Sequence, residues 1–366
     1  MNDRHASWIK LQRRLRFFLA TWGFTQALFG RRLNVYAASD TPGLPRSLSL
    51  AYRWLWLRML EAPDDGGLRR EAEALGRRAA AYCAGQGFPE HPDAPLPSFD
   101  WRSRSAQEFV REHIDRIPCP VVLKGFAADS RAVVEWSVDS LVDRFSNVEV
   151  QFIEGDRGPL ELVRTQGRYA HNAETLFAED PGLEEALEVD RLRPYAGNLA
   201  YHYSQMFLGY KATGSPLHAA NTWNFFLMVD GAKKWTFIDP EHSEFVHATL
   251  TENMVYCLSE SLTFPHAVDG ERHPMFRYCP RYTVLLEPGD VLLNPPWWWH
   301  AIENVTPSSV GVSSRWSSPL MTEPTNRMFL LLQMLSGRFW QVETEMLRPP
   351  KRDQTTELRT RERVTH

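Results

Sequence analysis

Apolar residues between positions 46 and 84 recur at the spacing of an amphipathic α-helix. Residues three and four positions apart share one face of a helix, so this pattern predicts helices that bury one side. Gly66-Gly67 interrupts the pattern and predicts a break between two helices. The regularly spaced residues of the first helix are Leu48, Tyr52, Leu55 and Met59.

After Phe99 the helical spacing gives way to short apolar runs. Pro120–Gly125 predicts a short buried strand that ends at glycine. Ser137–Phe145 predicts a helix, because serine is a favoured N-cap residue directly before an apolar-periodic segment.

From about residue 203 onward, the pattern is that of short strands separated by turns such as Asp230-Gly231 and Pro288-Gly289. Many short strands at this spacing predict a mainly β fold, either a sandwich or a jelly-roll barrel, with flanking helices. The predicted strands are Ser204–Tyr210, Trp223–Val229, Lys233–Ile238, Tyr282–Leu286, Asp290–Asn294, Ala301–Val305 and Ser309–Trp316.

These patterns divide the chain into four regions. Residues 1–98 form a helical N-terminal region that ends in a proline- and glycine-rich linker at 85–98, and residues 99–320 form the strand-rich domain. A C-terminal helix is predicted within 321–348, and 349–366 is a polar tail. The helix is apolar enough, over Met328–Leu347, to pack against a second copy of the chain in a homodimer.

A short apolar stretch at Phe17–Phe29 follows several basic residues and is similar to a secretory leader. It is interrupted by polar residues and falls short of the ~20 apolar residues of a spanning helix. We therefore expect an amphipathic helix packed on the protein, and no transmembrane segment.

Composition and charge narrow the class of partner. The 41 Lys and Arg against 45 Asp and Glu give a net charge of −4, so no overall basic field attracts a nucleic acid. The four cysteines lack the spacing of a zinc site or a disulfide framework, which favours a reducing, cytoplasmic location. The 13 tryptophans favour large apolar pockets or a well-filled β core.

Two histidines lie next to strand and turn signals. His218 ends the segment Ser-Pro-Leu-His, and His300 ends Asn-Pro-Pro-Trp-Trp-Trp-His, 82 residues later. A jelly roll brings sequence-distant strands together, so the two imidazoles can share one metal ion, and imidazole suits Fe, Zn, Cu and Ni alike. Taken alone, spacing favours the interpretation of either histidine as an ordinary core or surface residue.

The segments that carry these histidines resemble the cupin-like JmjC family of Fe(II)/2-oxoglutarate oxygenases. The matching stretches are GYKATGSPLHAANTWNFFLMVDGAKKWTFIDP at 209–240 and EPGDVLLNPPWWWH at 287–300. The resemblance implies a double-stranded β-helix core, with Fe(II), 2-oxoglutarate and O2 as cofactor and cosubstrates. By position, His218 and His300 correspond to the iron ligands, and Lys233 to the lysine that binds the distal carboxylate of 2-oxoglutarate.

Further positions correspond to the cosubstrate pocket of that family. Ser215 lies where a cosubstrate-binding threonine is common, and Asn224 where a polar residue points into the pocket. Arg315 lies 15 residues after His300, where relatives often carry a neutral amide. Its charge could attract chloride or a carboxylate. Alternatively, it could form a salt bridge on a strand of the barrel. Several tryptophans could line a substrate cavity or else pack in the core, namely Trp223, Trp235 and Trp297–Trp299. Of these, the candidates for the substrate pocket are Trp223, Trp235 and Trp299.

The chain departs from the family at the third iron ligand. The family motif is His-x-Asp/Glu, whereas this chain reads His218-Ala219-Ala220. Alanine cannot bind a metal, and within the wider superfamily a small residue at this position is a feature of radical halogenases, in which chloride binds iron instead. We therefore expect a halogenase or hydroxylase, with chloride as a further ligand in the first case.

Two alternatives to chlorination stay open. One is an atypical hydroxylase whose iron has two histidine ligands or borrows a Glu or His from elsewhere, and the other is a non-catalytic binding protein. The retention of both histidines, Lys233 and the Pro-Gly-Asp turn favours an enzyme. The substrate could be a small molecule, an amino acid, or a peptide- or carrier-bound group.

Overall fold

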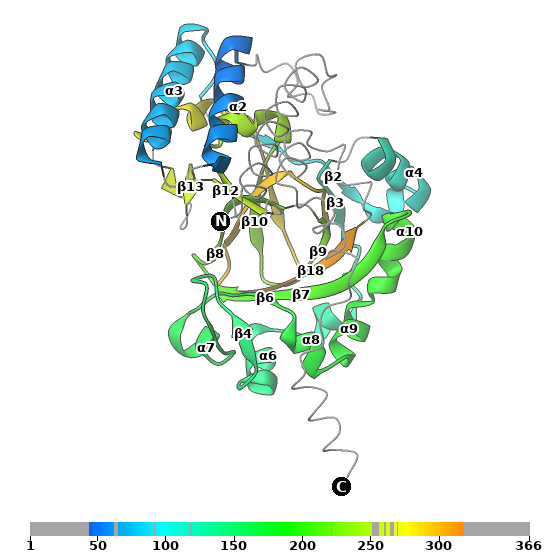
Figure 1. Cartoon of the computed structure of the whole chain (residues 1–366). Coiled ribbons are helices and arrows are strands. Elements are labelled where there is room, and N and C mark those ends of the chain that lie inside the picture. Colours follow the sequence, from blue (N-terminus) through cyan, green and yellow to red (C-terminus); the bar gives the residue numbers. More distant parts are fainter. Residues whose placement is uncertain are drawn as a thin grey trace, which may run out of the picture.

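The computed structural model describes residues 44–61, 65–90, 93–116, 119–220, 222–250, 256–259, 261–263, 267–268 and 270–317. The predicted helices at 17–29 and 328–347 and the polar tail lie outside the described residues. Within the described part, two seven-stranded sheets form the centre of the molecule, and helices cover their outer faces (Figure 1).

The first sheet holds both candidate iron-binding histidines. Its order is β1-β15-β10-β17-β8-β12-β11, antiparallel except where β1 pairs with β15. Its strands are β1 (Asp93–Pro95), β8 (Gly214–Ala220), β10 (Lys233–Ile238), β11 (Ala248–Leu250), β12 (Tyr256–Ser259), β15 (Arg281–Leu286) and β17 (Trp299–Asn304).

The second sheet has the order β2-β3-β16-β9-β18-β7-β6. Its strands are β2 (Ser98–Asp100), β3 (Val121–Lys124), β6 (Ala170–Ala173), β7 (Ala200–Tyr210), β9 (Trp223–Asp230), β16 (Val291–Asn294) and β18 (Ser308–Ser317). Two small hairpins accompany the sheets, β4 (Glu149–Gln151) with β5 (Arg157–Pro159) and β13 (Leu262–Thr263) with β14 (Ala267–Val268).

Strand β9 illustrates how the two sheets are packed. Every residue from Trp223 to Val229 is buried. Phe226 and Met228 belong to the cluster between the sheets, whereas Phe225 and Leu227 belong to the cluster under the helices. Since successive side chains of a strand point to opposite faces, a continuous apolar run marks a strand covered on both sides.

A helical hairpin covers the outer face of the first sheet (Figure 1). It consists of α2 (Arg46–Glu61) and α3 (Gly66–Gly85), whose buried residues pack with η5 (Pro240–Phe245) and η6 (Pro274–Tyr278). Asp65 caps α3 by accepting a hydrogen bond from the Gly67 amide, so the predicted break between two helices is confirmed.

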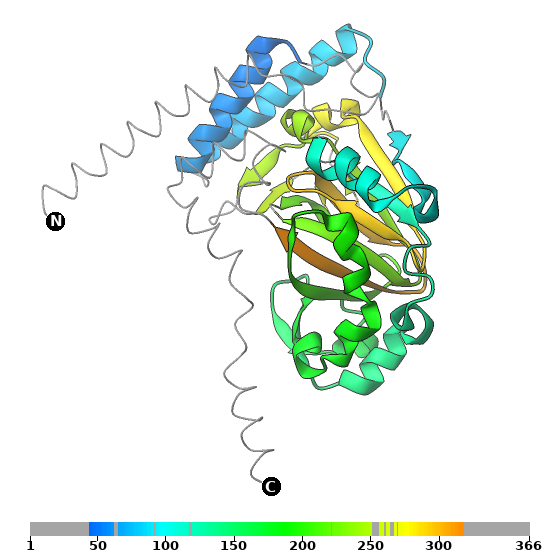
Figure 2. The same cartoon turned by 90° about the vertical axis from the view of Figure 1, so that its right-hand side faces the viewer.

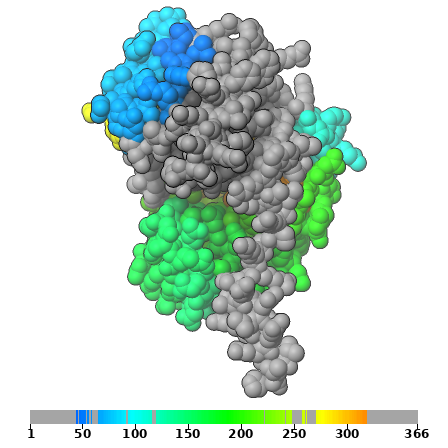
Figure 3. All heavy atoms as spheres, viewed as in Figure 1, coloured from blue at the N-terminus to red at the C-terminus, as the bar shows by residue number. Residues whose placement is uncertain are grey.

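Shorter helices cover the outer face of the second sheet, as the turned view makes clear (Figure 2). In the space-filling view the α2–α3 hairpin and the segment containing α6 to α10 form separate parts of the surface (Figure 3). These elements are η2 (Trp101–Ser103), α4 (Ala106–Val110), η3 (Arg111–Arg116), α5 (Arg131–Glu135), α6 (Val138–Phe145), α7 (Leu162–Gln166), α8 (Thr175–Glu179), α9 (Gly182–Leu187), η4 (Val189–Leu192) and α10 (Arg193–Ala196).

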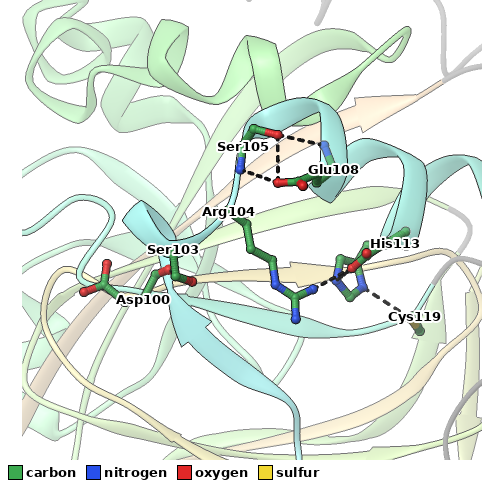
Figure 4. Close-up of polar contacts among 8 residues, drawn as sticks. Asp100, Ser103, Arg104, Ser105, Glu108, His113 and Cys119 are labelled. Carbon is green, nitrogen blue, oxygen red and sulfur yellow. Dashed lines mark hydrogen bonds and ion pairs between the residues drawn. The ribbon is translucent and has the colours of Figure 1, made fainter.

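Two of these helices begin with capping boxes. Ser137 and Ser140 cap α6, as the sequence predicts, and Ser105 and Glu108 do the same for α4 (Figure 4). Figure 4 also shows His113, whose Nδ1 lies 3.5 Å from Cys119 Sγ beneath the α4–η3 segment. All four cysteines are buried thiols that form no disulfide.

The mainly β fold with flanking helices and a jelly-roll core is confirmed. Two local predictions were incomplete. The linker at 85–98 contains β1 and the first residue of β2, which pair in parallel with β15 and β3. The strand that carries His218, β8, was not predicted as a strand, because proline and alternating small residues hide its period. None of the described helices is long and apolar enough to cross a membrane.

Candidate functional site

His218 and His300 are direct neighbours across two antiparallel strands. They form a registered pair between β8 and β17, and their ring centroids are 4.1 Å apart. Their Nδ1 atoms lie 2.7 Å from the Pro216 carbonyl oxygen and 2.8 Å from the Trp298 carbonyl oxygen. When neutral, each ring therefore donates from Nδ1 and keeps Nε2 as an acceptor, which is the tautomer that binds metals through Nε2.

The pKa values of both rings are low. Burial lowers the pKa of His218 to about 4. The pKa of His300 is well below its usual value, mainly because the ring is buried and next because His218 lies beside it. Both imidazoles are therefore neutral near pH 7. Neutral imidazole is the form that coordinates a metal.

The turn before His300 fixes the position of Ala220. Trp297 adopts a φ of +66°, a conformation that bulky side chains rarely take, and its amide donates a 2.7 Å hydrogen bond to the Ala220 carbonyl. Strain of this kind costs roughly 1–3 kcal/mol and persists where surrounding contacts enforce it. The strained turn therefore connects the end of β8 to the strand that carries His300. That end of β8 includes Ala220, where the family motif has a carboxylate.

A cavity of about 570 Å³ opens beside the two histidines. Ala220 lines it, so the position of the missing carboxylate faces the cavity with a methyl group. No group of three His, Cys, Asp or Glu residues suited to a metal occurs in the described part of the chain. The lining residues are Gln151, Ile153, Tyr169, His171, Asn172, Tyr203, Gln205, Phe207, Ser215, His218, Ala220, Thr222, Asn224, Phe226, Trp235, His300, Ile302, Ser313 and Arg315.

Lys233 lies deeper in the barrel. Its side chain is fully buried, and its Nζ donates hydrogen bonds to Asn304 Oδ1 at 2.5 Å and Ser309 Oγ at 3.1 Å. Both partners are neutral, and burial lowers the pKa of Lys233 to about 7. Its neighbour Lys234 is exposed, because adjacent strand residues point in opposite directions.

Tyr169 lies between the cavity lining and this lysine's surroundings, since it lines the cavity and its ring is close to Lys233 Nζ. Tyr169 lines the cavity, whereas Lys233 does not, and the tyrosine ring centroid is 5.3 Å from Lys233 Nζ. The Tyr169 hydroxyl bonds Ser215, and burial raises the pKa of the phenol. Sequence reasoning missed Tyr169, because it lies 64 residues before Lys233 and outside the histidine motifs.

The structure separates the three candidate tryptophans. Trp235 lines the cavity and stacks on His300, with ring centroids 5.6 Å apart. Trp223 and Trp299 are not among the residues that line it, so the structure gives them the core-packing role that the sequence left open. Trp223 packs under the second sheet's helices, and Trp299 packs under the α2–α3 hairpin and donates from Nε1 to Ser243 Oγ at 2.9 Å.

The other predicted residues gather at the cavity. Ser215, Asn224 and Arg315 all line it together with the histidine pair. Of the other histidines considered as a third ligand, His202, His242, His247 and His273 do not line it, and His266 lies outside the described residues. His171 does line it, but its ring nitrogens lie 3.0 Å from the Phe152 carbonyl oxygen and 3.1 Å from Asn172 Nδ2.

These residues fit a transition metal and a dianionic cosubstrate in different degrees. Two neutral imidazoles with oriented Nε2 atoms suit iron, although no third protein ligand accompanies them in the described residues. A buried lysine with neutral partners suits a carboxylate, and the ring of Tyr169, which lines the cavity, lies beside its Nζ.

Comparison with known proteins agrees with this geometry. Residues 160–321 match the family described as the cupin-like domain, so the fold and the paired histidines belong to a cupin-like domain with homology to JmjC proteins. The chain is 32% identical over 114 residues to human HSPB1-associated protein 1. The aligned stretch covers 30% of this chain and 23% of that protein.

Two further relatives carry activities in their names. The chain is 23% identical over 296 residues to the bifunctional arginine demethylase and lysyl-hydroxylase psr-1 of Caenorhabditis briggsae, covering 72% of this chain and 70% of that protein. It is 26% identical over 116 residues to the arginine-specific demethylase JMJ20 of Arabidopsis thaliana, covering 31% of this chain and 24% of that protein. The matches to HSPB1-associated protein 1 and JMJ20 thus span about a quarter of those relatives' lengths.

Proposed function

We propose that the protein is an Fe(II)- and 2-oxoglutarate-dependent oxygenase that functionalises a C–H bond. The observation that carries the proposal is the registered pair His218 and His300, each held by a backbone carbonyl at Nδ1 and both lining one cavity. The names of two relatives, a lysyl-hydroxylase and an arginine demethylase, support oxidative chemistry on a carbon centre.

Each residue has a distinct proposed role. His218 and His300 would hold the iron, which supplies the oxidising power drawn from O2 and 2-oxoglutarate. Lys233 would bind the distal carboxylate of 2-oxoglutarate after the Tyr169 ring moves aside, with Ser215 as a hydrogen-bond partner. Trp235, stacked on His300, excludes water from one side of the pair.

Chlorination is the second candidate, and Ala220 is the observation that favours it. A methyl group faces the cavity where the family carries a carboxylate, which leaves room for an exogenous anion beside the histidines. Arg315 lines the same cavity and contributes positive charge close to both rings. Chloride would suit that position in size and charge.

Anaerobic titration with Fe(II) and 2-oxoglutarate, followed by visible absorption, tests the proposed function. We expect a charge-transfer band in the native protein that His218→Ala and His300→Ala abolish. If the native protein binds neither Fe(II) nor 2-oxoglutarate and consumes no 2-oxoglutarate, the oxygenase proposal is rejected in favour of a non-catalytic binding role.

The variant Ala220→Asp distinguishes hydroxylation from chlorination. In a halogenase, the new carboxylate occupies the position of the halide, so chlorinated product disappears or turnover stops. In a hydroxylase with two histidine ligands, Ala220→Asp maintains or raises hydroxylation, and chloride makes no difference to the native protein. Mass spectrometry of products with and without chloride or bromide separates the two.

A further inference from the structure

The exposed side of α3 carries a row of arginines. The buried residues of this helix, among them Ala72 and Ala79, pack in the cluster under the hairpin. Arg70, Arg77 and Arg78 are exposed on the other side of the helix and are called the basic face below. Arg70 and Arg77 are two turns apart, which separates them by about 10 Å along the helix axis.

The carboxylates of α3 have partners that lie off this face. Glu71 pairs with Arg58 of α2 at 2.7 Å. Glu73 lies 3.8 Å from Arg272, just before η6. The basic face forms no ion pair with any carboxylate in the part of the chain that the structure describes. Its charge is therefore available to an anionic surface outside the molecule.

The charge of the chain is divided between two regions. Residues 46–85, the α2–α3 hairpin, carry seven arginines and five acidic residues, a net charge of +2. Residues 138–187, from α6 to α9, carry eleven acidic residues and four arginines, a net charge of −7. Figure 1 and Figure 2 both place these regions at opposite ends of the described molecule, so they do not meet within one copy.

Two exposed glutamates lie side by side along the chain in the acidic region. Glu179 is the last residue of α8, and Glu185 lies in the first turn of α9. Asp180 between them is paired with Arg144 of α6. Glu179 and Glu185, called the acidic surface below, form no ion pair with a described residue. The acidic surface and the basic face thus carry exposed charges of opposite sign at the two ends of one molecule.

We propose that the protein associates with a second copy of itself, with the basic face of one molecule docking on the acidic surface of the next. Charge complementarity between two surfaces of the same chain favours this partner. The contact joins two different surfaces, so it is heterologous, and each dimer keeps one basic face and one acidic surface for further copies. Exposed ion pairs are weak and screened by salt, so the association depends on protein concentration and ionic strength.

Sedimentation of the full chain measures this association. At about 20 mM salt the mean mass should rise with protein concentration, and at about 500 mM it should return to that of a single chain, because salt shortens the range of the attraction. The triple variant Arg70→Gln/Arg77→Gln/Arg78→Gln and the double variant Glu179→Gln/Glu185→Gln should each weaken association roughly tenfold or more. The matched control Arg111→Gln/Arg131→Gln changes two exposed arginines outside both surfaces and should behave as the native protein.

Mixing the two variants tests the geometry of the contact. Each variant alone lacks one of the two surfaces and should sediment as a single chain. In an equimolar mixture, the intact basic face of the glutamate variant can dock on the intact acidic surface of the arginine variant. We therefore expect a 1:1 complex that does not grow further. An interface of the basic face with itself would instead leave the glutamate variant dimeric on its own.

Three results would overturn the proposal: the native protein keeps one mass over the whole concentration range, association persists at high salt or in the arginine variant, or the mixed variants form no complex. Melting temperatures close to that of the native protein exclude unfolding as the cause of a loss, since surface substitutions usually change stability little. None of these measurements involves iron or turnover, so their outcome is independent of the oxygenase proposal.

Discussion

The two ends of the barrel interior bury polar groups in different ways. At the cavity end, His218 and His300 direct Nδ1 to nearby backbone carbonyls, those of Pro216 and Trp298, two residues before each histidine. At the closed end, Lys233 depends on side chains contributed by other strands, Asn304 and Ser309, and carries a lowered pKa. The first arrangement directs Nδ1 of both rings to backbone carbonyls, and the second holds a lysine with a lowered pKa between neutral side chains.

The difference indicates how each end responds to its ligand. An imidazole pair held by backbone bonds needs little rearrangement to accept a metal, since tautomer and ring orientation are already set. At the lysine end we expect more change, because a carboxylate that binds Lys233 would lie close to the Tyr169 ring and would raise the proton affinity of the lysine. We therefore expect metal binding to be nearly rigid and cosubstrate binding to be coupled to motion and pH.

The largest expected effect comes from removing one member of the histidine pair. His218→Ala or His300→Ala should lose most bound Fe(II), because each removes one of the two proposed protein ligands. Metal analysis of protein reconstituted without oxygen measures the loss. His113→Ala, which removes a histidine outside the cavity, is the control and should retain full stoichiometry. Unchanged iron in both cavity variants would show that the pair is structural.

The next effect tests the closed end. Lys233→Met should weaken 2-oxoglutarate binding by about a hundredfold, since it removes a charge-assisted contact while keeping the volume of the side chain. Lys234→Met, on the opposite face of the same strand, should change the affinity less than twofold in calorimetry of the Fe(II)-loaded protein kept anaerobic. Equal losses in the two variants would show that the alignment is wrong at this strand.

The sequence predicts the functional residues at the two ends to different extents. The aromatic and proline-rich segments around His300, together with the family resemblance, were enough to pair it with His218, and strand alternation was enough to choose Lys233 over Lys234. Tyr169 could not be found in this way, because its role depends on β6 and the chain just before it lying beside β7. The orientation of Trp223 was likewise decided by the helices outside the sheet.

The third prediction uses pH to distinguish the ends. The free Lys233 has a pKa of about 7, so it is protonated below that value and neutral above it. If 2-oxoglutarate binds the ammonium form, its affinity should be nearly constant below about pH 6, begin to fall as the pH approaches 7, and fall by up to about tenfold per pH unit well above 7. The pKa of His218, about 4, lies outside this range, so Fe(II) affinity should not follow the same curve. Parallel pH profiles would contradict separate control of the two ends.

The smallest expected effect comes from giving Lys233 a permanent anionic partner. Asn304 is fully buried, accepts from Lys233 Nζ at 2.5 Å, and donates from Nδ2 to Thr213 Oγ1 at 2.7 Å. Asn304→Asp keeps the size of the side chain but supplies a carboxylate that competes with the cosubstrate, so 2-oxoglutarate should bind several-fold more weakly. The same carboxylate raises the pKa of Lys233, so the remaining affinity should lose its decline between pH 7 and 8. Asn172→Asp, a change of the same chemistry on the cavity wall away from the lysine, should leave that pH profile as it is in the native protein. If Asn304→Asp lowered the affinity while the decline above pH 7 persisted, Lys233 would not be the group that titrates.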